Sequence, residues 1–373
     1  MKLIQILKKF FIVSLATFFL ILILDFFLGS YILKRLEPYI SQTQFYERLI
    51  RIDHPVYHHT LKENINYPNS RGFDRYFTIC TDNHGFRFEC NKKRGNEFDF
   101  VFIGDSFTEG SSKNYEYTYA GLFEKETNLS VANMGIVSYA PYIYLSKLNF
   151  FLNKGYKFKH VVLFIDISDL YDDNVFYTID KNLIVSEKYA IEKNLKIRKF
   201  LRNYFPFTNF YMFVIKNLDL NANKSFDRIE VKTNSLPTFL DKPNLKAKWT
   251  YAQSDQIEGF DGSILEAQKK MIKTVEEIYK LLNKNDIKLS IVVYPWPQQL
   301  QNDKINSKHA TMWENFCNNK CYKFINLFPI LFNEMEKTDL LSVYKKYYWW
   351  GDVHFNLAGD KLVANELIKN FKQ

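Results

Sequence analysis

The chain has 373 residues, 47% of them hydrophobic, which is enough to bury one sizeable core and to carry an appended segment. Its formal net charge of +9 comes from 50 basic residues that are scattered along the sequence and form no basic block. This distribution argues against nucleic acid as a partner and leaves attraction to anionic lipid or acidic glycans open.

Residues 1–40 have the pattern of a membrane anchor. Lys8 and Lys9 precede an apolar run from Phe10 to Leu28, which only Asp25 interrupts. About 20 residues of helix cross the hydrocarbon core, so this run is just long enough. No small-x-small cleavage site and no lipobox cysteine is evident after it, which favours an uncleaved signal anchor over a cleaved signal peptide or a buried helix. The N-terminal lysines favour a cytoplasmic N-terminus, so we expect a single-pass protein with its main domain in the periplasm or at the cell surface.

Residues 41–97 form an extracytoplasmic approach segment that is polar and aromatic. Its adjacent histidines, His58 and His59, point apart on most backbones, and no carboxylate cluster frames them. Packing or solvated histidines are therefore favoured over metal ligands. Arg87 could line a site or form a structural ion pair, and we favour the ion pair.

The cysteines would lie in an oxidising compartment, where disulfides persist. Cys80, Cys90, Cys317 and Cys321 allow three pairings, and the short loops favour Cys80–Cys90 and Cys317–Cys321. A zinc site is the alternative, which the lack of C-x-x-C spacing and of nearby histidines disfavours. We therefore expect no metal and no other cofactor.

From Phe98 to the C-terminus, apolar strands alternate with helix-length segments, a pattern typical of a parallel sheet with helices on both faces. The sequence predicts strands at 98–103, 129–133, 160–165, 288–294 and 322–326. It predicts helices at 115–127, 141–154, 263–284, 308–318 and 357–371. The expected fold is a three-layer α/β/α architecture with a flavodoxin-like sheet of about five strands. Residues 175–255 fit neither pattern, so we expect an insertion that carries its own helices, acts as a lid or packs near the membrane.

The first predicted strand stops at Gly104-Asp105-Ser106, which indicates a buried strand that ends in a tight turn. Such strand ends are where open α/β sheets carry their chemistry. Ser106 becomes a nucleophile only if a base takes its proton and donors stabilise the oxyanion that follows. The alternative is that Ser106 has a structural role as the N-cap of a helix.

The far end of the chain supplies a base. Asp352 precedes His354 by two residues, just ahead of the last predicted helix, and an imidazole oriented by a carboxylate is what a serine nucleophile requires. Of the seven histidines, only His354 combines these features, so we expect it to be the general base and Asp352 to orient it. After the second predicted strand, the Asn133 amide and the Gly135 N–H could face an oxyanion.

The Gly-Asp-Ser turn, the Asn133-Met134-Gly135 segment and the late Asp-x-His together resemble the SGNH (GDSL-type) hydrolase superfamily of esterases, lipases and O-acyltransferases. The resemblance runs from about Thr78 to the C-terminus with an unmatched middle, and it is closest to membrane-anchored bacterial members. The spacing of Asp352 and His354 is similar to that of the alginate O-acetyltransferase branch.

The resemblance implies acyl transfer through Ser106, with oxyanion donors at Gly135 and Asn133. It also implies a third donor, at the position where the superfamily has an asparagine and this chain has Ser168. A hydroxyl reaches less far than a carboxamide, and the loss of one oxyanion donor lowers the rate roughly a hundred- to a thousandfold. Ser168 therefore predicts slow turnover, a different donor or a lost activity.

Two functions follow as expectations. The first is a membrane-anchored extracytoplasmic serine esterase or O-acyltransferase that acts on acetyl esters of a cell-envelope polysaccharide. Its partners would be the lipid bilayer, the polysaccharide and a membrane protein that supplies acyl groups. The second is a catalytically decayed protein of the same fold that binds glycans or assists assembly. A Ser106 hydroxyl within hydrogen-bond reach of His354 favours the enzyme, and a separation above ~6 Å favours the binding protein.

Overall fold

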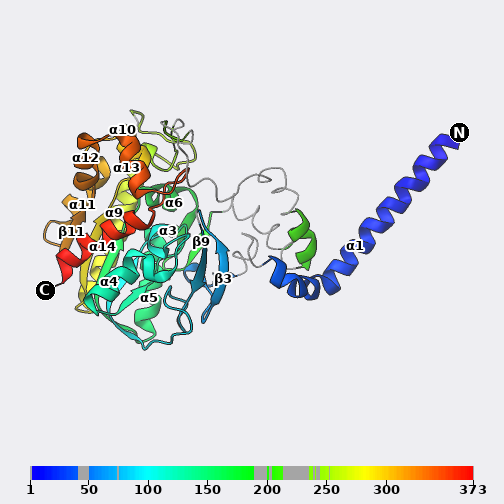
Figure 1. The fold of residues 1–373 in the computed structure, drawn as a ribbon, viewed down its shortest axis with the longest axis horizontal. Helices are drawn as coiled ribbons and strands as arrows, with labels where there is room; N and C mark the ends of the chain where they lie inside the picture. The colour runs from blue at the N-terminus through cyan, green and yellow to red at the C-terminus, as the bar shows by residue number, and fades with distance from the viewer. Residues whose placement is uncertain are drawn as a thin grey trace. The chain divides into compact units, whose positions relative to one another are not determined.

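The computed structural model describes residues 2–40, 50–73, 75–188, 200, 204–212, 235–237, 240, 244–251 and 253–372. The chain forms two compact units (Figure 1). One comprises Met1–Leu49 and Tyr189–Ser225, and the other comprises Ile50–Lys188 and Phe226–Gln373. The start of the approach segment and most of the expected insertion lie outside the described residues.

The larger unit is built on a parallel sheet, and all five predicted strands are confirmed. The strands are β5 (Glu97–Ile103), β6 (Val131–Asn133), β7 (Lys157–Phe164), β10 (Lys288–Val293) and β11 (Lys323–Asn326). They pair in the order β11-β10-β7-β5-β6. The central strand residues are fully buried, which explains why they read as continuous apolar runs in the sequence. Because all five strands are parallel, their carboxyl ends meet at one edge of the sheet.

Helices cover the sheet, which gives the expected α/β fold. The five predicted helices are confirmed as α4 (Tyr119–Thr127), α5 (Pro141–Asn153), α9 (Ile264–Lys284), α11 (Lys308–Cys317) and α14 (Leu357–Phe371). Helix α4 packs against α14, and α5 packs against α9 (Figure 1). Residues Tyr115–Tyr117, predicted as the start of α4, form a separate 3-10 turn, η1, because Thr118 adopts extended backbone and caps α4.

Within the described residues of the larger unit, five shorter helices were not predicted. They are α3 (Ser106–Glu109), α6 (Asp169–Val175), α10 (Pro297–Asn302), α12 (Phe328–Lys337) and α13 (Leu340–Tyr347). Segments this short contain few repeats of the helical period, so periodicity does not reveal them. Two of them, α3 and α6, begin directly after strand ends and lie where the chemistry was expected.

The approach segment folds as two antiparallel hairpins of the larger unit. The strands are β1 (Arg51–His54) with β2 (His58–Leu61), and β3 (Asn66–Arg71) with β4 (Tyr76–Cys80). A third hairpin pairs β8 (Tyr177–Ile179) with β9 (Val185–Glu187). In place of the strand expected to begin near Arg87, the structure has two isolated bridges, from Arg87 to Thr81 and from Arg87 to Asn133. In the second, the Arg87 N–H donates to the Asn133 carbonyl at 3.2 Å.

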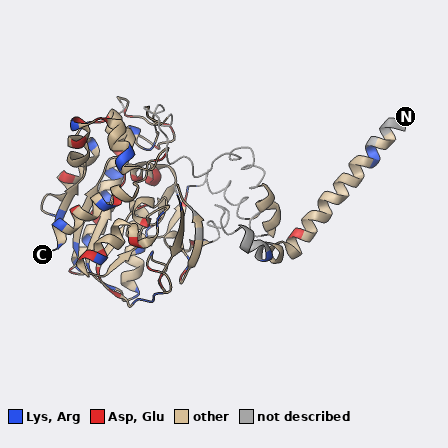
Figure 2. Ribbon diagram, in the orientation of Figure 1, with Lys and Arg blue, Asp and Glu red and all other residues tan. Residues whose placement is uncertain are grey.

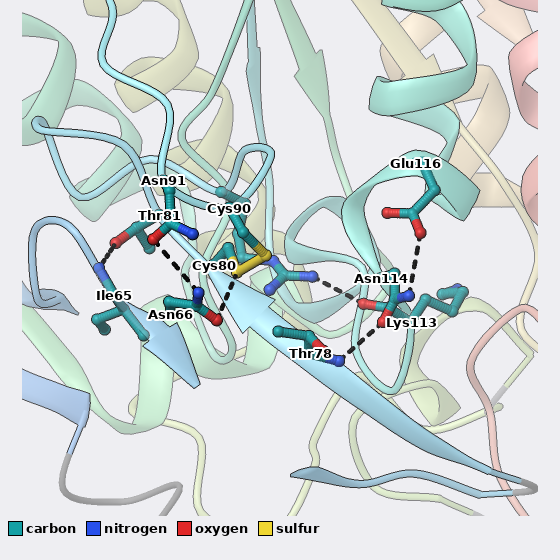
Figure 3. Close-up of a disulfide and its surroundings, with 11 residues drawn as sticks. Ile65, Asn66, Thr78, Cys80, Thr81, Cys90, Asn91, Lys113, Asn114 and Glu116 are labelled. Atoms are coloured by element: carbon teal, nitrogen blue, oxygen red, sulfur yellow. Dashed lines mark hydrogen bonds between the residues drawn. A yellow bond between two sulfur atoms is a disulfide. The ribbon is translucent and has the colours of Figure 1, made fainter. Parts of the chain in front are cut away.

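Both expected disulfides, Cys80–Cys90 and Cys317–Cys321, are present. The first joins the end of β4 to the loop that follows it (Figure 3). Beside it, the Thr78 N–H donates to the Asn114 side-chain carbonyl at 2.7 Å, so β4 is tied to the loop that follows α3 (Figure 3).

The smaller unit contains one long helix, α1 (Lys2–Ile40), whose apolar side chains are largely exposed. Its stretch from Lys8 to Ile32 has a mean hydropathy of 2.6 and is long and apolar enough to cross a membrane. Figure 2 shows that charged residues on α1 are confined to a few positions. A second helical stretch of this unit covers residues 206–212.

Candidate active site

The nucleophile candidate stands at the carboxyl end of β5, in the first turn of α3. Asp105 caps this helix by accepting a hydrogen bond from the Phe107 N–H at 2.9 Å, so Ser106 is the first helical residue and not the cap. A Cβ atom at Gly104 would lie 2.1 Å from Thr108 Oγ1 and 2.9 Å from the Phe164 carbonyl oxygen. Only glycine allows this turn to pack so closely, and the turn directs Ser106 out of the sheet edge.

The structure brings Ser106, His354 and Asp352 together. The Ser106 Oγ lies 2.6 Å from His354 Nε2, although the two residues are 248 positions apart. His354 Nδ1 makes a short hydrogen bond to the Asp352 carboxylate. The Asp352 carboxylate can only accept, so Nδ1 carries the proton and Nε2 is free to accept the proton of Ser106. This is the arrangement of a serine, a base and an orienting acid.

A tight loop between α13 and α14 sets this geometry. The Trp349 N–H donates to the His354 carbonyl at 2.9 Å, and the Asp352 N–H donates to the Trp349 carbonyl at 3.1 Å. Gly351, with a φ of +77°, makes the turn. The His354 N–H also donates to the Asp352 side chain at 2.9 Å. The loop therefore places the imidazole and its carboxylate on the same side.

The surroundings of His354 raise its pKa. Burial lowers the pKa of His354, but the hydrogen bond and the charge of Asp352 outweigh it, and the resulting pKa lies above the ordinary 6.5. Its side chain remains 20% exposed, so a substrate can reach it. Burial raises the pKa of Asp352, and the hydrogen bond from His354 brings it below its ordinary value. Asp352 therefore stays ionised at neutral pH.

Two of the residues expected as oxyanion donors, Gly135 and Asn133, have hydrogen-bond partners within the protein. The Gly135 N–H donates to Asn133 Oδ1 at 3.1 Å, and the buried Asn133 amide donates to the Thr108 carbonyl at 2.8 Å. A Cβ atom at Gly135 would lie 2.4 Å from Thr108 Cβ, so the residue must be glycine for the loop to pack on α3. These bonds hold the loop together, and they compete with donation to an oxyanion.

Ser168 lies in the turn between β7 and α6 and is 3% exposed. Its N–H donates to Asp166 Oδ1 at 2.7 Å, and its hydroxyl interacts with the same carboxyl and lowers the pKa of Asp166. Both polar groups of Ser168 therefore act on Asp166. By contrast, the Ser106 N–H has no hydrogen-bond partner in the part of the chain that the structure describes. The Ser106 N–H is therefore free to donate to an oxyanion that forms next to Ser106 Oγ.

Two buried carboxyls stand next to Ser106. Asp105 Oδ2 lies 3.3 Å from the Ser106 Oγ, and Asp166 accepts a hydrogen bond from the indole of Trp296 at 2.6 Å. Burial and the charge of Asp166 raise the pKa of Asp105 to about 8. Burial also raises the pKa of Asp166. These groups come from the ends of β5, β7 and β10, which meet at this edge of the sheet.

A buried ion pair stabilises the site. The sequence did not indicate it. Lys113 Nζ pairs with the Asp360 carboxylate and donates to the Phe355 carbonyl at 2.8 Å. The Tyr119 N–H donates to the other Asp360 oxygen at 2.9 Å. A lysine in a loop and an aspartate in the first turn of a helix follow no sequence motif, so nothing in the sequence marks them as partners.

A second ion pair holds the loop that follows β6. Glu109, at the end of α3, binds both terminal nitrogens of Arg51 at 2.7 and 2.5 Å and accepts the Val137 N–H at 2.7 Å. Burial raises the pKa of Glu109, but Arg51 outweighs it, so the pKa lies below its ordinary value. Arg87 was expected in an ion pair. Its buried guanidinium donates to the carbonyls of Glu109 at 3.2 Å and Lys113 at 2.7 Å, so its role is structural.

Aromatic side chains wall the site. The Phe107 ring lies 4.7 Å from the His354 ring, and Phe73, from the β3–β4 hairpin, lies 6.5 Å from it. Phe73 also stacks on Trp349 at 5.8 Å. The indole N–H of Trp349 is buried and has no hydrogen-bond partner among the described residues. The sequence did not indicate Phe73, because it comes from a separate hairpin.

The described residues contain no group of three or more His, Cys, Asp and Glu side chains that could hold a metal ion. His59 packs inside the larger unit, where its Nε2 donates to the Val137 carbonyl at 2.9 Å. His58 lies 3.0 Å from a Glu187 oxygen. Both histidines therefore have structural contacts near the loop that follows β6.

No family model matches the chain, and no curated protein matches it. Its fold is similar to those of solved esterases. The psychrotrophic esterase EstA from Pseudoalteromonas sp. is 11% identical, with a TM-score of 0.36 over 74% of this chain and 97% of EstA. Axe2, an acetylxylan esterase from Geobacillus stearothermophilus, is 13% identical, with a TM-score of 0.37 over 73% of this chain and 93% of Axe2.

A lipolytic protein of the G-D-S-L family from Desulfitobacterium hafniense DCB-2 is 12% identical, with a TM-score of 0.37 over 74% of this chain and all of that protein. These identities and TM-scores are too low to carry a conclusion about activity. The function therefore rests on the chain's own residues.

Proposed function

We propose that this chain is a membrane-anchored extracytoplasmic serine esterase or O-acyltransferase that works through an acyl-Ser106 intermediate. The observation that carries the proposal is the 2.6 Å separation of Ser106 Oγ and His354 Nε2. This distance is within direct hydrogen-bond reach and far below the ~6 Å that would favour a binding protein.

In the first half of the reaction, Ser106 Oγ attacks the carbonyl carbon of an ester. His354 Nε2 takes the hydroxyl proton, and Asp352 stabilises the imidazolium that forms. The Ser106 N–H donates to the oxyanion. The tetrahedral intermediate then expels the alcohol, which receives the proton from His354. The acyl group stays on Ser106 Oγ as an ester.

In the second half, His354 takes a proton from the incoming acceptor, which attacks the acyl carbon, and Ser106 Oγ leaves with that proton. Water as acceptor gives hydrolysis, and a sugar hydroxyl gives acyl transfer. The two reactions share the same intermediate and differ only in which acceptor reaches it. Phe73 is the partly exposed ring among the aromatic side chains near His354, and it offers an apolar face on which a sugar ring can stack.

The envelope polysaccharide is proposed as the substrate because of the anchor. The apolar stretch from Lys8 to Ile32 would hold the enzyme at a membrane, with the larger unit outside the cytoplasm. Two disulfides in the larger unit fit an oxidising compartment. Acetyl esters on a cell-surface glycan are within reach of such an enzyme, and a membrane protein that supplies acyl groups would be its partner in transfer.

The bonds around the expected oxyanion donors favour a second candidate, a decayed glycan-binding protein. The Gly135 N–H is taken by Asn133, and Ser168 is bonded to Asp166. Among the candidate donors, the Ser106 N–H is the one that has no partner within the described residues, and loss of oxyanion donors lowers rates steeply.

A serine-directed fluorophosphonate probe separates the two candidates. Full-length protein in detergent is expected to take up one probe at Ser106, as located by peptide mass mapping. Labelling should disappear in Ser106→Ala, fall strongly in His354→Asn and persist in Ser111→Ala, the control on a neighbouring serine. A folded protein that takes up no probe, or equal labelling of the Ser106→Ala variant, would overturn the enzyme and favour the binding protein.

The acceptor is tested with a chromogenic acetyl ester in the presence and absence of an oligosaccharide. Formation of an acetylated sugar at the expense of free acetate identifies a transferase. Acetate alone identifies a hydrolase.

A further inference from the structure

Asp25, the one charged residue within the apolar run of α1, has a specific partner. It is 3% exposed, and its carboxylate accepts the Phe207 N–H at 2.9 Å and the Thr208 N–H at 2.6 Å. These are N–H groups of the first turn of the helix at 206–212, which have no partner within that helix. Asp25 therefore caps a helix that lies far along the chain in the expected insertion.

The contact between α1 and this helix is close. A Cβ atom at Gly29 would lie 3.1 Å from Pro206 Cγ and 1.9 Å from Asp25 Oδ1, so glycine leaves the room that the contact needs. The Phe26 ring stacks on Tyr204 at 5.9 Å with an interplanar angle of 6°. Capping, close approach and ring stacking all hold the segment against the same part of α1.

The segment has the composition of a membrane interface. Residues 204–212 contain no charged side chain. The exposed fractions are 54% for Phe200, 47% for Tyr204, 58% for Tyr211 and 45% for Met212. In the sequence, the segment is preceded by four basic residues, Lys196, Arg198, Lys199 and Arg202. Aromatic rings beside basic residues are typical of helices that lie in the headgroup region of anionic membranes.

We propose that residues 204–212 form a second membrane-contacting element, which lies in the headgroup region of the bilayer beside α1 and is held there by Asp25. The proposal rests on the anchor proposed above. Asp25 precedes Ile32, the end of the apolar stretch, by seven residues, or about 10 Å of helix. This depth agrees with the roughly 5–10 Å to which interfacial helices sink. We expect the exposed side chains of the segment to contact the bilayer, because the segment is fixed to α1, whose exposed apolar side chains lie in lipid if α1 is the anchor.

The proposal is tested by fluorescence of full-length protein in vesicles of phosphatidylcholine and phosphatidylglycerol. Tyr211→Cys carries an environment-sensitive NBD label, and Tyr117→Cys, a similarly exposed tyrosine of the larger unit, is the matched control. The label at 211 is expected to shift to the blue and to be quenched several-fold more by shallow nitroxide lipids than the label at 117. Equal quenching at both positions in vesicles that carry the protein would overturn the proposal.

The role of Asp25 is tested in the same vesicles. Asp25→Ala removes both acceptors and is expected to reduce the quenching at 211, while the protein still floats with the vesicles through α1. Asp25→Asn keeps one acceptor oxygen, so its quenching at position 211 should lie between that of wild type and that of Asp25→Ala. Unchanged quenching in Asp25→Ala would overturn the role of Asp25.

Two further outcomes are distinguishable. Protein that fails to float with vesicles contradicts the anchor itself. A blue shift that depends on protein concentration and not on lipid would mean that a second copy of the chain covers the segment, and it would overturn the lipid contact.

A separate observation concerns Asp105. The Ser106 hydroxyl has one proton, which points to His354 Nε2 because the proton of the imidazole is on Nδ1. The 3.3 Å contact between Ser106 Oγ and Asp105 Oδ2 then has no proton from the serine. It is a hydrogen bond only if Asp105 carries the proton.

The surroundings of Asp105 favour its neutral form. It is 3% exposed, and no lysine or arginine pairs with it or with Asp166 within the described residues. The titratable groups whose charges act on it or respond to it are His354, Asp166, Asp169, Asp172, Tyr119, Tyr144 and Tyr294. Of these, only His354 can become positive. A carboxyl among buried carboxyls retains its proton to a higher pH than one in water.

We further infer that Asp105 is a neutral carboxylic acid that donates a hydrogen bond to Ser106 Oγ and holds it toward His354. This inference rests on the reaction proposed at Ser106. The donated bond fixes the direction of the nucleophile before substrate arrives, and correct orientation is a large part of catalytic efficiency.

Asp105→Asn tests this directly, because a carboxamide reproduces the neutral acid. Its oxygen can accept the Phe107 N–H, and its NH₂ can donate to Ser106 Oγ. Ester hydrolysis at pH 7 is expected to stay within about 10-fold of wild type, whereas Asp105→Ala should lose about 100-fold. Above pH 8 the wild-type rate should fall as Asp105 ionises, and the Asp105→Asn rate should not. A loss in Asp105→Asn as large as in Asp105→Ala would overturn the inference.

Unfolding by urea gives a readout that does not need activity. A carboxyl whose pKa is raised on folding loses stability as the pH rises from its unfolded pKa to its folded pKa. The stability of Asp105→Asn relative to wild type should therefore increase between pH 4 and about pH 8 and then level off. If the difference in the free energy of unfolding between Asp105→Asn and wild type stays constant over this range, Asp105 is not neutral. If the difference increases but the wild-type protein has no esterase activity, only the proposed reaction is contradicted.

Discussion

Lys113 and Asp360 form a buried ion pair that joins the two distant parts of the proposed catalytic site. Lys113 lies in the loop after α3, which carries Ser106, and Asp360 lies in the first turn of α14, just after His354. Their side chains are 3% and 1% exposed. The pair, together with the bond from Lys113 to the Phe355 carbonyl, fixes the segment that carries Ser106 to the segment that carries His354.

Lys113→Met should destabilise the larger unit strongly, because Asp360 is left buried without its cation. A loss of about 3–5 kcal/mol in the free energy of unfolding is expected for a broken buried pair. Urea denaturation of the purified protein, followed by tryptophan fluorescence, measures it. The matched control is Lys157→Met, which breaks the exposed pair with Glu97 and should leave the midpoint unchanged. Equal midpoints for wild type and Lys113→Met would contradict the importance of the pair.

Asp352→Asn should reduce kcat while leaving the fold intact. The carboxamide can present its NH₂ to His354 Nδ1 and so favour the wrong tautomer, in which Nε2 carries the proton and cannot accept that of Ser106. A loss of up to about 10⁴ in kcat for an acetyl ester is expected, with little change in KM. Steady-state kinetics measure both, and thermal unfolding checks that the variant is folded. A variant with wild-type kcat would remove Asp352 from the mechanism.

The pH dependence of kcat/KM should follow His354. The base must be neutral to take the proton of Ser106, so activity rises with pH through the pKa of His354, below the fall above pH 8 that we expect from ionisation of Asp105. Because Asp352 raises that pKa, the midpoint should lie above 6.5. In Asp352→Asn the charge is gone while burial remains, so the midpoint of the residual activity should move to lower pH. A midpoint that does not move between the two proteins would show that another group controls the profile.

Ser168→Ala should have a small effect, because the Ser168 hydroxyl interacts with the Asp166 carboxyl and the Ser168 N–H bond to Asp166 is kept. We expect kcat to fall less than about 10-fold, against the roughly hundred- to thousandfold loss that follows removal of an oxyanion donor. Ester hydrolysis compared across wild type, Ser168→Ala and Ser111→Ala gives the measurement. A loss of a hundredfold or more in Ser168→Ala alone would return Ser168 to the oxyanion hole.

The sequence by itself determined the order and type of the main elements. Buried parallel strands are apolar on both faces and their helices repeat at three and four residues, so both patterns are visible in one dimension. It also indicated Ser106, Asp352 and His354, since the turn after β5 and the Asp-x-His spacing are local features. The two disulfides were expected from short loops for the same reason.

Only the tertiary structure decided how these residues work together. The motif named Asn133 as an oxyanion donor, but its amide donates to the Thr108 carbonyl of α3, a contact between segments 25 residues apart. The same holds for Asp25 with the helix at 206–212 and for Lys113 with Asp360. Such contacts depend on how the folded backbone brings distant side chains within a few ångströms, and residue order carries no periodic or local signal for that distance.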